Sequence, residues 1–193
     1  LQDEEPGATL PYWDWRTDDG NARIADIFSK KEDDDGTPNP FFNFHINMPE
    51  IGVDRDTERF PGQLPPTAGI TLPTSKEVDE VLYDPDDSFY EFSERLRGIH
   101  NGIHVWTGGL GVWKDGSFGQ GDMGVQSFAS FDPIFWFHHG MVDKLWWMWQ
   151  KRKGINNIPA DWLNFVLERF ELKVIDVLNI DELGYDYAAE GAV

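Results

Sequence analysis

The sequence contains no cysteine, so its 193 residues form no disulfide, no thiolate metal site and no cysteine nucleophile. No apolar run approaches the roughly 20 residues that a membrane-spanning helix needs. Basic residues are scarce: 16 Lys and Arg stand against 35 Asp and Glu, which gives a net charge of −19. Because phosphate contacts need a basic surface, this balance argues against nucleic acid and against anionic membranes as partners.

Aromatic residues are abundant by contrast, with nine Trp and fourteen Phe in a chain that is 40% hydrophobic. A chain of this length can form one domain with a large core. Residues 1–75 are rich in Pro, Gly and Asp, and they predict exposed loops at 30–40 and 61–69 with at most a helical turn at 21–28. We therefore expect a mainly α fold with long irregular loops.

A first long helix is predicted to begin near Ser88, because Ser88 and Glu91 have the spacing of a capping box. Apolar residues then recur every three or four positions up to Ile103. The helix should end by Gly108 and Gly109. Seven glycines between residues 107 and 124 predict a loop after it.

A second long helix has clear signals at both ends. Asp132 is a good N-cap and Pro133 a good first residue. The cations at 151–153 suit the last turn, and Gly154 can close it. The segment 162–187 is interpreted as a further helix followed by a short strand or turn.

Four of the five histidines lie on these two predicted helices. His100 and His104 are four residues apart, so they share one helix face and can reach a single ion. His138 and His139 are adjacent, about 100° apart on a helix, so only one of them can easily face the same point. These residues predict a site of three imidazoles, a ligand set that suits copper, zinc, iron or nickel.

Two neighbours of the histidines refine this hypothesis. Asp143 lies four residues after His139, where a carboxylate can support a ligating imidazole, although an N–H or Arg partner elsewhere in the core would also explain it. Asn101 stands where the zinc peptidase motif H-E-x-x-H has its glutamate. Because an amide cannot take a proton as that glutamate does, this class of peptidase is disfavoured.

Several segments together resemble the type 3 copper proteins, which comprise tyrosinases, catechol oxidases and molluscan hemocyanins. They are LPYWDW (10–15), HNGIHVWTGG (100–109), GDMG (121–124), SFDPIFWFHHGMVDKLW (130–146) and IDVLNIDELGYDY (175–187). The resemblance implies part of a four-helix bundle that holds two copper ions, each bound by three histidines, with dioxygen between them. It assigns the ligands of the second copper to His100, His104 and His139, and it leaves His138 a supporting or structural role.

The resemblance also identifies what this chain does not carry. In the family the first copper site precedes the segment that is LPYWDW here, at residues 10–15. The fifth histidine, His45, follows that segment and is interpreted as an ordinary loop or core residue. Residues 1–193 are therefore expected to be the C-terminal portion of the copper-binding core domain, and the sequence starts without Met, as a processed chain would. A second chain or a cleaved N-terminal half is expected to supply the first copper; a single-copper half-site protein is the other explanation.

The function that the resemblance implies is oxidation of a small phenolic substrate, from o-diphenol to o-quinone, with monophenol hydroxylation as a further activity. Family members link hydroxylation to an Asn beside the first ligand and a nearby Glu. Asn101 matches the Asn, and Glu94 and Glu91 are the candidates for the Glu. Arg97 competes for the matching position, and Glu91 has its capping role.

Access of substrate is expected to depend on Val105, on Met123 and on Gln126, which matches the family's gate residue over the second copper. Packing in the loop is the alternative role for Met123. A hemocyanin-like oxygen carrier is the competing function. It is disfavoured because the chain ends shortly after Tyr185 and Tyr187, without the β-rich domain that shields the hemocyanin site.

Overall fold

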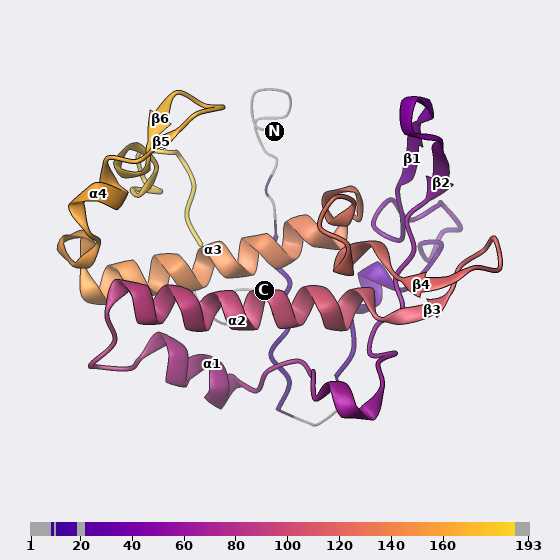
Figure 1. The fold of residues 1–193 in the computed structure, drawn as a ribbon, viewed down its shortest axis with the longest axis horizontal. Helices are drawn as coiled ribbons and strands as arrows, with labels where there is room; N and C mark the ends of the chain where they lie inside the picture. The colour runs from indigo at the N-terminus through magenta and orange to yellow at the C-terminus, as the bar shows by residue number, and fades with distance from the viewer. Residues whose placement is uncertain (1–8, 10, 19–21, 188–193) are drawn as a thin grey trace.

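The computed structural model describes residues 9, 11–18 and 22–187. Two helices of 20 residues each dominate it, α2 (Phe89–Gly108) and α3 (Ile134–Lys153). They run side by side through the middle of the molecule, and the short helix α1 (Ser75–Leu82) packs against both (Figure 1). No helix in the described part of the chain is both long and apolar enough to cross a membrane.

Three small antiparallel hairpins and one short helix are the other helical and strand elements of the described residues. The strands β1 (His45–Met48) and β2 (Val53–Asp56) pair with His45 opposite Asp56, and β3 (Leu110–Val112) pairs with β4 (Phe118–Gln120). Beyond α3 come α4 (Ala160–Leu163) and the hairpin of β5 (Val166–Leu167) and β6 (Leu172–Lys173). Irregular segments with short 3-10 turns make up the rest of the described residues. The dominance of helix over strand confirms the mainly α class with long loops.

The predicted boundaries of the two long helices are confirmed, except that α3 begins one residue later than predicted, with Pro133 instead of Asp132 as its N-cap. The side chain of Ser88 accepts a hydrogen bond from the Glu91 backbone N–H, and the Glu91 carboxylate accepts one from the Ser88 N–H, which is the predicted capping box. The α3 helix begins at Ile134, where the Asp132 carboxylate accepts from the Ile134 N–H. Gly154 ends it at a φ of 76°, a conformation that glycine adopts without strain.

Other predictions were wrong or only partly right. The glycine-rich stretch 107–124 is not all loop, because β3 and β4 pair within it. The β1–β2 hairpin before residue 75 was not anticipated. The segment 162–187 was predicted to contain a helix followed by a short strand or turn. Its helix ends already at Leu163, and the short strands β5 and β6 follow as predicted. The helical turn expected at 21–28 is the 3-10 turn Asp26–Phe28; Asn21 lies outside the described residues.

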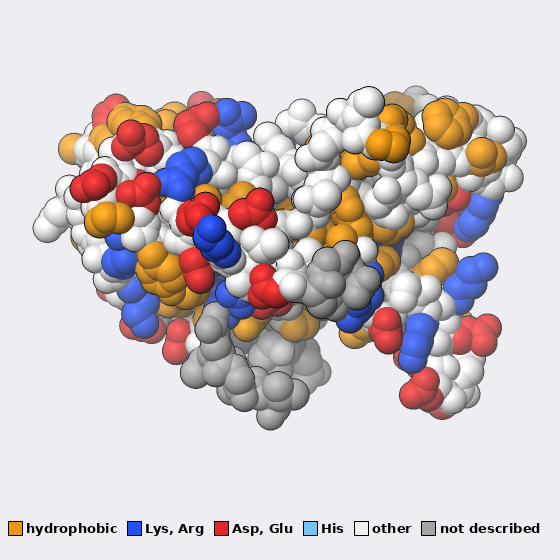
Figure 2. All heavy atoms as spheres, turned by 90° about the horizontal axis from the view of Figure 1, so that it is seen from below, with side chains coloured by type: hydrophobic (Ala, Val, Ile, Leu, Met, Phe, Trp, Pro, Cys, Tyr) orange, Lys and Arg blue, Asp and Glu red, His pale blue; other side chains and the backbone are white. Residues whose placement is uncertain are grey.

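Aromatic rings pack the space between the long helices and the segment that precedes them. Phe92 of α2 stacks on Trp149 of α3, with ring centroids 4.7 Å apart and planes 10° from parallel. Trp13 and Trp15 come from the N-terminal segment and are buried in the same core. Such rings bury large areas and hold the helices in one relative position. On the face drawn in Figure 2, hydrophobic side chains also reach the surface at both ends of the molecule.

Candidate metal centre

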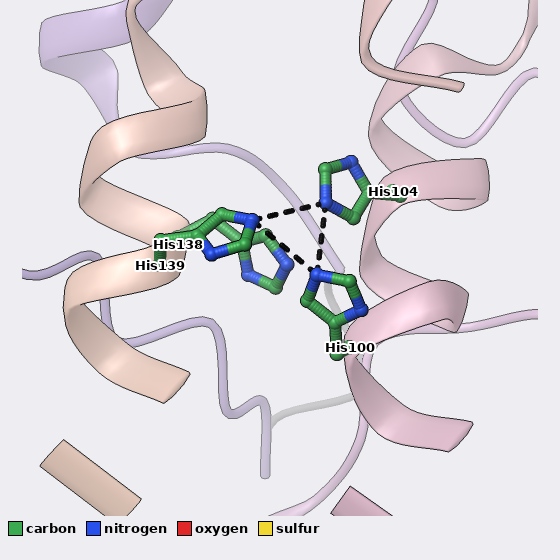
Figure 3. Close-up of side chains that lie close together, drawn as sticks. All are labelled: His100, His104, His138 and His139. Atoms are coloured by element: carbon green, nitrogen blue, oxygen red, sulfur yellow. Dashed lines mark hydrogen bonds between the residues drawn. The ribbon is translucent and has the colours of Figure 1, made fainter. Parts of the chain in front are cut away.

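The α2 and α3 helices bring four histidines to one point between them. His100 and His104 project from one face of α2, and His138 and His139 project from α3 toward them (Figure 3). We call these four side chains the histidine cluster. Their candidate ligand atoms all lie within 4.8 Å of one another. The pairing of α2 with α3 therefore joins two histidine pairs that are more than 30 positions apart in the sequence.

Three Nε2 atoms form a small triangle within this cluster. The Nε2 atoms of His100 and His104 are 3.1 Å apart, and the Nε2 atom of His139 lies 3.3 Å from the first and 3.4 Å from the second. An ion at about 2.0–2.1 Å from each nitrogen, in tetrahedral directions, would need nitrogens about 3.3–3.4 Å apart. The triangle thus has the dimensions of a three-imidazole metal site.

The contacts of the Nδ1 atoms indicate why a cation fits this triangle. The Nδ1 atom of His104 lies 2.8 Å from the carbonyl oxygen of Met123, and that of His100 lies 2.9 Å from the side-chain oxygen of Asn101. Since both oxygens accept, both Nδ1 atoms carry the proton and both Nε2 atoms present lone pairs. Two lone pairs 3.1 Å apart repel each other, and a metal ion between them removes the repulsion.

Burial keeps the rings of His139 and His104 in the neutral form that binds metals. It lowers the pKa of His139 to about 4, with His100 and His104 as further causes. Burial also lowers the pKa of His104, although the Met123 carbonyl acts in the opposite direction. His104 and His139 are therefore neutral at pH 7, so a metal ion does not have to displace protons from these two rings. The residues present therefore fit a metal ion of the type that imidazoles prefer.

His138 lies behind the triangle and is fully buried. Its ring stacks on that of His100, with centroids 5.1 Å apart and planes 20° from parallel. Neither of its nitrogens has a hydrogen-bond partner, and burial lowers its pKa well below the ordinary range. This position suits a packing role behind His100, which remains the prediction for this residue.

Asp143 does not support His139 by a hydrogen bond. Its carboxylate instead accepts hydrogen bonds from the hydroxyls of Tyr185, at 3.0 Å, and Tyr187. Burial and this carboxylate raise the pKa of Tyr185 to about 12. Asp143 therefore fastens the C-terminal segment to α3, and its partners are tyrosine hydroxyls instead of the N–H or Arg partner of the alternative explanation.

The two glutamates predicted beside the cluster lie away from it. Glu91 is occupied by the capping box at the start of α2, nine residues and hence about 13 Å along the helix from His100. Glu94 is exposed and pairs with the guanidinium of Arg97. Of the proposed catalytic side chains, only Asn101 contacts a histidine of the cluster.

The three candidates for the substrate gate occupy different environments. Gln126 is exposed and Val105 is half-buried. The Met123 side chain is 1% exposed and belongs to the core, so packing describes it better than a gate does. Its backbone carbonyl, however, holds His104, a role that no pattern in the sequence indicated.

Phe135 is a second residue that the sequence analysis missed. Its ring stacks on His139 with centroids 4.1 Å apart and planes 29° from parallel. It precedes His139 by four residues, so the helical spacing could have identified it. His45, in contrast, lies on β1 away from the cluster, and both of its ring nitrogens are bonded to Asp54 and Asp56.

Comparison with known proteins agrees with this geometry. Residues 1–152 match the family described as the common central domain of tyrosinase. A tyrosinase of Streptomyces lincolnensis is 34% identical over 171 residues, which cover 79% of this chain and 57% of the relative. Hemocyanin 1 of Megathura crenulata is 31% identical over 158 residues, 80% of this chain and 4% of that protein.

Solved structures share the fold. A pro-tyrosinase of Aspergillus oryzae has a TM-score of 0.66 at 19% identity, over 93% of this chain and 49% of that chain. A copper-depleted active tyrosinase of the same organism, complexed with L-tyrosine, has a TM-score of 0.67 over 97% of this chain and 65% of that chain. The chain thus spans about half to two thirds of the tyrosinases that it matches. Its sequence matches and its fold together show that it belongs to the tyrosinase family.

Proposed function

We propose that this chain forms half of the binuclear copper site of a phenol oxidase. The reaction is the oxidation of two o-diphenols by one dioxygen to two o-quinones and two waters. The observation that carries the proposal is the triangle of Nε2 atoms from His100, His104 and His139, at 3.1–3.4 Å, with lone pairs turned toward its centre. Copper is the metal that the family implies for such a site.

Copper would supply the redox chemistry by accepting electrons from the phenol and passing them to dioxygen. The residues of this chain hold and orient that metal. His100 and His104 come from one rigid helix, and His139 is clamped by the ring of Phe135. Rigid placement of this kind keeps the imidazoles in position before the metal or the substrate arrives.

A second copper needs three further ligands from a polypeptide segment outside these 193 residues. The chain has five histidines, and four of them form the cluster. The fifth, His45, is bonded to Asp54 and Asp56. We therefore propose that another chain, or an N-terminal segment of the same protein, completes the site with its own histidines.

Oxidation of o-diphenols is favoured over hydroxylation of monophenols. The family links hydroxylation to an Asn and a Glu that together deprotonate the phenol. Asn101 lies beside His100, but Glu91 and Glu94 form a helix cap and an exposed ion pair. Neither of these two glutamates is therefore placed to act as the base that deprotonates a monophenol.

The proposal is tested with the complete protein that contains this chain. Copper content and quinone formation from a simple catechol are measured for the wild type, for His139→Ala and for the matched control His45→Ala. We expect two coppers per complete site, catechol oxidation, loss of one copper and of activity in H139A, and no change in H45A. Absence of copper from the wild type, or full activity in H139A, would contradict the proposal.

The similarity to hemocyanin 1 makes an oxygen carrier the second candidate. The same preparation separates the two functions. Reversible dioxygen binding without catechol turnover would identify a carrier, whereas a single copper without dioxygen binding would identify a half-site protein.

A further inference from the structure

The orientation of His104 depends on a backbone carbonyl from another part of the chain. Its Nδ1–H donates to the carbonyl oxygen of Met123 at 2.8 Å. This bond keeps the proton on Nδ1 and turns the Nε2 lone pair toward the histidine cluster. Whatever holds the Met123 carbonyl in place therefore also determines where His104 points.

Met123 lies in a turn that is too short to be stable by itself. The turn η4 (Asp122–Gly124) is a single 3-10 turn of three residues, and glycines 121 and 124 bracket Met123 and its neighbour. Short 3-10 turns have poor hydrogen-bond geometry, and glycine favours the unfolded chain entropically. The position of the turn must come from contacts with other elements.

The side chain of Asp122 supplies those contacts. It is fully buried, and its carboxylate accepts two hydrogen bonds from the Arg55 guanidinium, at 2.7 and 2.8 Å. It also accepts one from the Glu58 N–H at 2.9 Å, while the Asp122 N–H donates to the Glu58 carbonyl at 2.8 Å. Four hydrogen bonds thus join the residue next to Met123 to the end of β2 and the segment after it.

Arg55 is itself held in a fixed orientation. Its guanidinium lies over the ring of Trp113, 4.4 Å from the centroid, and over that of Phe128, at 5.2 Å. It also donates to the carbonyl of Asp56. The planar fork of arginine suits both the aromatic faces and the bidentate carboxylate, which lysine cannot match. The β1–β2 and β3–β4 hairpins, at one end of the molecule in Figure 1, are joined through this residue.

The turn is also in direct backbone contact with the end of α2. A Cβ atom on Gly108 would lie 2.4 Å from the Gly124 nitrogen, and one on Gly121 would lie 2.4 Å from the Gly108 carbonyl. Only glycine permits this approach. Since Gly108 is four residues after His104, a displacement of the turn acts on the same stretch of helix that carries the ligand.

We infer that Arg55 and Asp122 are positioning residues for the metal site: they fix the Met123 carbonyl, and through it the ring of His104. This inference rests on the proposed function to the extent that the cluster binds a metal. Neither residue touches the cluster. Their effect on it passes through the Met123 carbonyl and through the backbone contact of the turn with the end of α2.

The test uses Asp122→Asn, Arg55→Met and Arg55→Lys in the complete protein. Arg95→Met is the matched control, because Arg95 also pairs with an aspartate, Asp84, at 2.7 Å, but has no contact with η4. Two properties are measured: copper affinity by competition with a chelator, and the protonated nitrogen of His104 in the metal-free protein by NMR of ¹⁵N-labelled histidine. The wild type should show the proton on Nδ1.

Loss of such a supporting contact typically weakens metal binding about 10–100-fold. We expect this loss of copper affinity in D122N and R55M, together with a mixture of His104 tautomers, a smaller loss in R55K and none in R95M. The double variant R55M/D122N should be no worse than the more affected single variant, because the two residues act as one unit.

Wild-type copper affinity and an unmixed Nδ1–H tautomer in folded D122N or R55M would overturn the inference. If D122N or R55M fails to fold, R55K decides the question by the same two measurements. If the wild type binds no copper, the proposed function fails, while the tautomer of His104 still tests the positioning role by itself.

Discussion

Asp87 joins the two histidine-bearing helices at their other end. It precedes α2, and its side chain is 1% exposed. It accepts a hydrogen bond from the indole N–H of Trp149 at 2.9 Å, and it pairs with Lys153 at 2.6 Å and Arg152 at 3.3 Å. These three partners all come from the last turns of α3, so one carboxylate fastens the start of α2 to the end of α3.

The substitution Asp87→Ala should lower the free energy of unfolding by about 3 kcal/mol. A buried donor that loses its partner costs about 1–3 kcal/mol, and this describes the indole N–H of Trp149. Breaking a buried ion pair costs about 3–5 kcal/mol, but Lys153 and Arg152 remain partly exposed to water, so this contribution is smaller. Asp87→Asn keeps an acceptor for Trp149 and should lose about half as much.

The loss of stability in D87A should also depend on pH. Burial by itself would raise the pKa of Asp87, but the contacts with Lys153, Trp149 and Arg152 outweigh it and leave the pKa below its usual value. A carboxylate with a depressed pKa stabilises the fold above its unfolded pKa, and this contribution is lost as the pH falls through the folded pKa. The difference between wild type and D87A should therefore shrink below about pH 4.

Urea unfolding followed by tryptophan fluorescence, at pH 7 and at pH 3, measures both effects. The control is Glu94→Gln, which removes an exposed ion pair with Arg97 and should leave the midpoint unchanged. Equal midpoints for D87A and the control at pH 7 would refute the reasoning, because they would mean that the buried contacts of Asp87 contribute nothing.

Three further predictions follow from the structure. Gly109→Ala places a Cβ 1.7 Å from the Phe60 carbonyl oxygen at a φ of +59°, so it should cost about 3 kcal/mol or more, measured by thermal denaturation. Burial raises the pKa of Asp132 to about 6, although the charge of Arg59 acts in the opposite direction. The protonated carboxyl therefore stabilises the fold fully below its unfolded pKa, and this contribution is lost as the pH rises through 6. Asp132→Asn should remove this change, so the free energy of unfolding of the variant should vary less with pH between about pH 4 and 6. A hundredfold excess of copper over its Kd should raise the free energy of unfolding by about 2.7 kcal/mol, and His139→Ala should abolish the rise in a calorimetric scan.

Local signals in the sequence predicted the two elements that carry the site. The capping box of Ser88 and Glu91, and the helix end at Gly154, act within one turn of the chain, so a linear pattern contains them. The hairpins were missed for the opposite reason. The strands β3 and β4 are three residues each and contain two glycines, and their stability comes from packing, such as Phe60 against Trp113, which no local period records.

The same distinction separates the candidate metal ligands from the residues that orient their rings. The spacing of His100 and His104 specifies one helix face, so the sequence could identify this pair, and the family resemblance added His139. The partners of those rings obey no such period. The carbonyl that holds His104 comes from residue 123, in a stretch of glycines, and Asp143, although correctly spaced on the helix, turns to tyrosines more than 40 residues away. A helical period specifies which side chains share a helix face. It does not specify which segment of the chain packs against that face, because tertiary packing determines this. The candidate ligands can therefore be predicted from this sequence, whereas the orientation of their rings is a property of the folded chain.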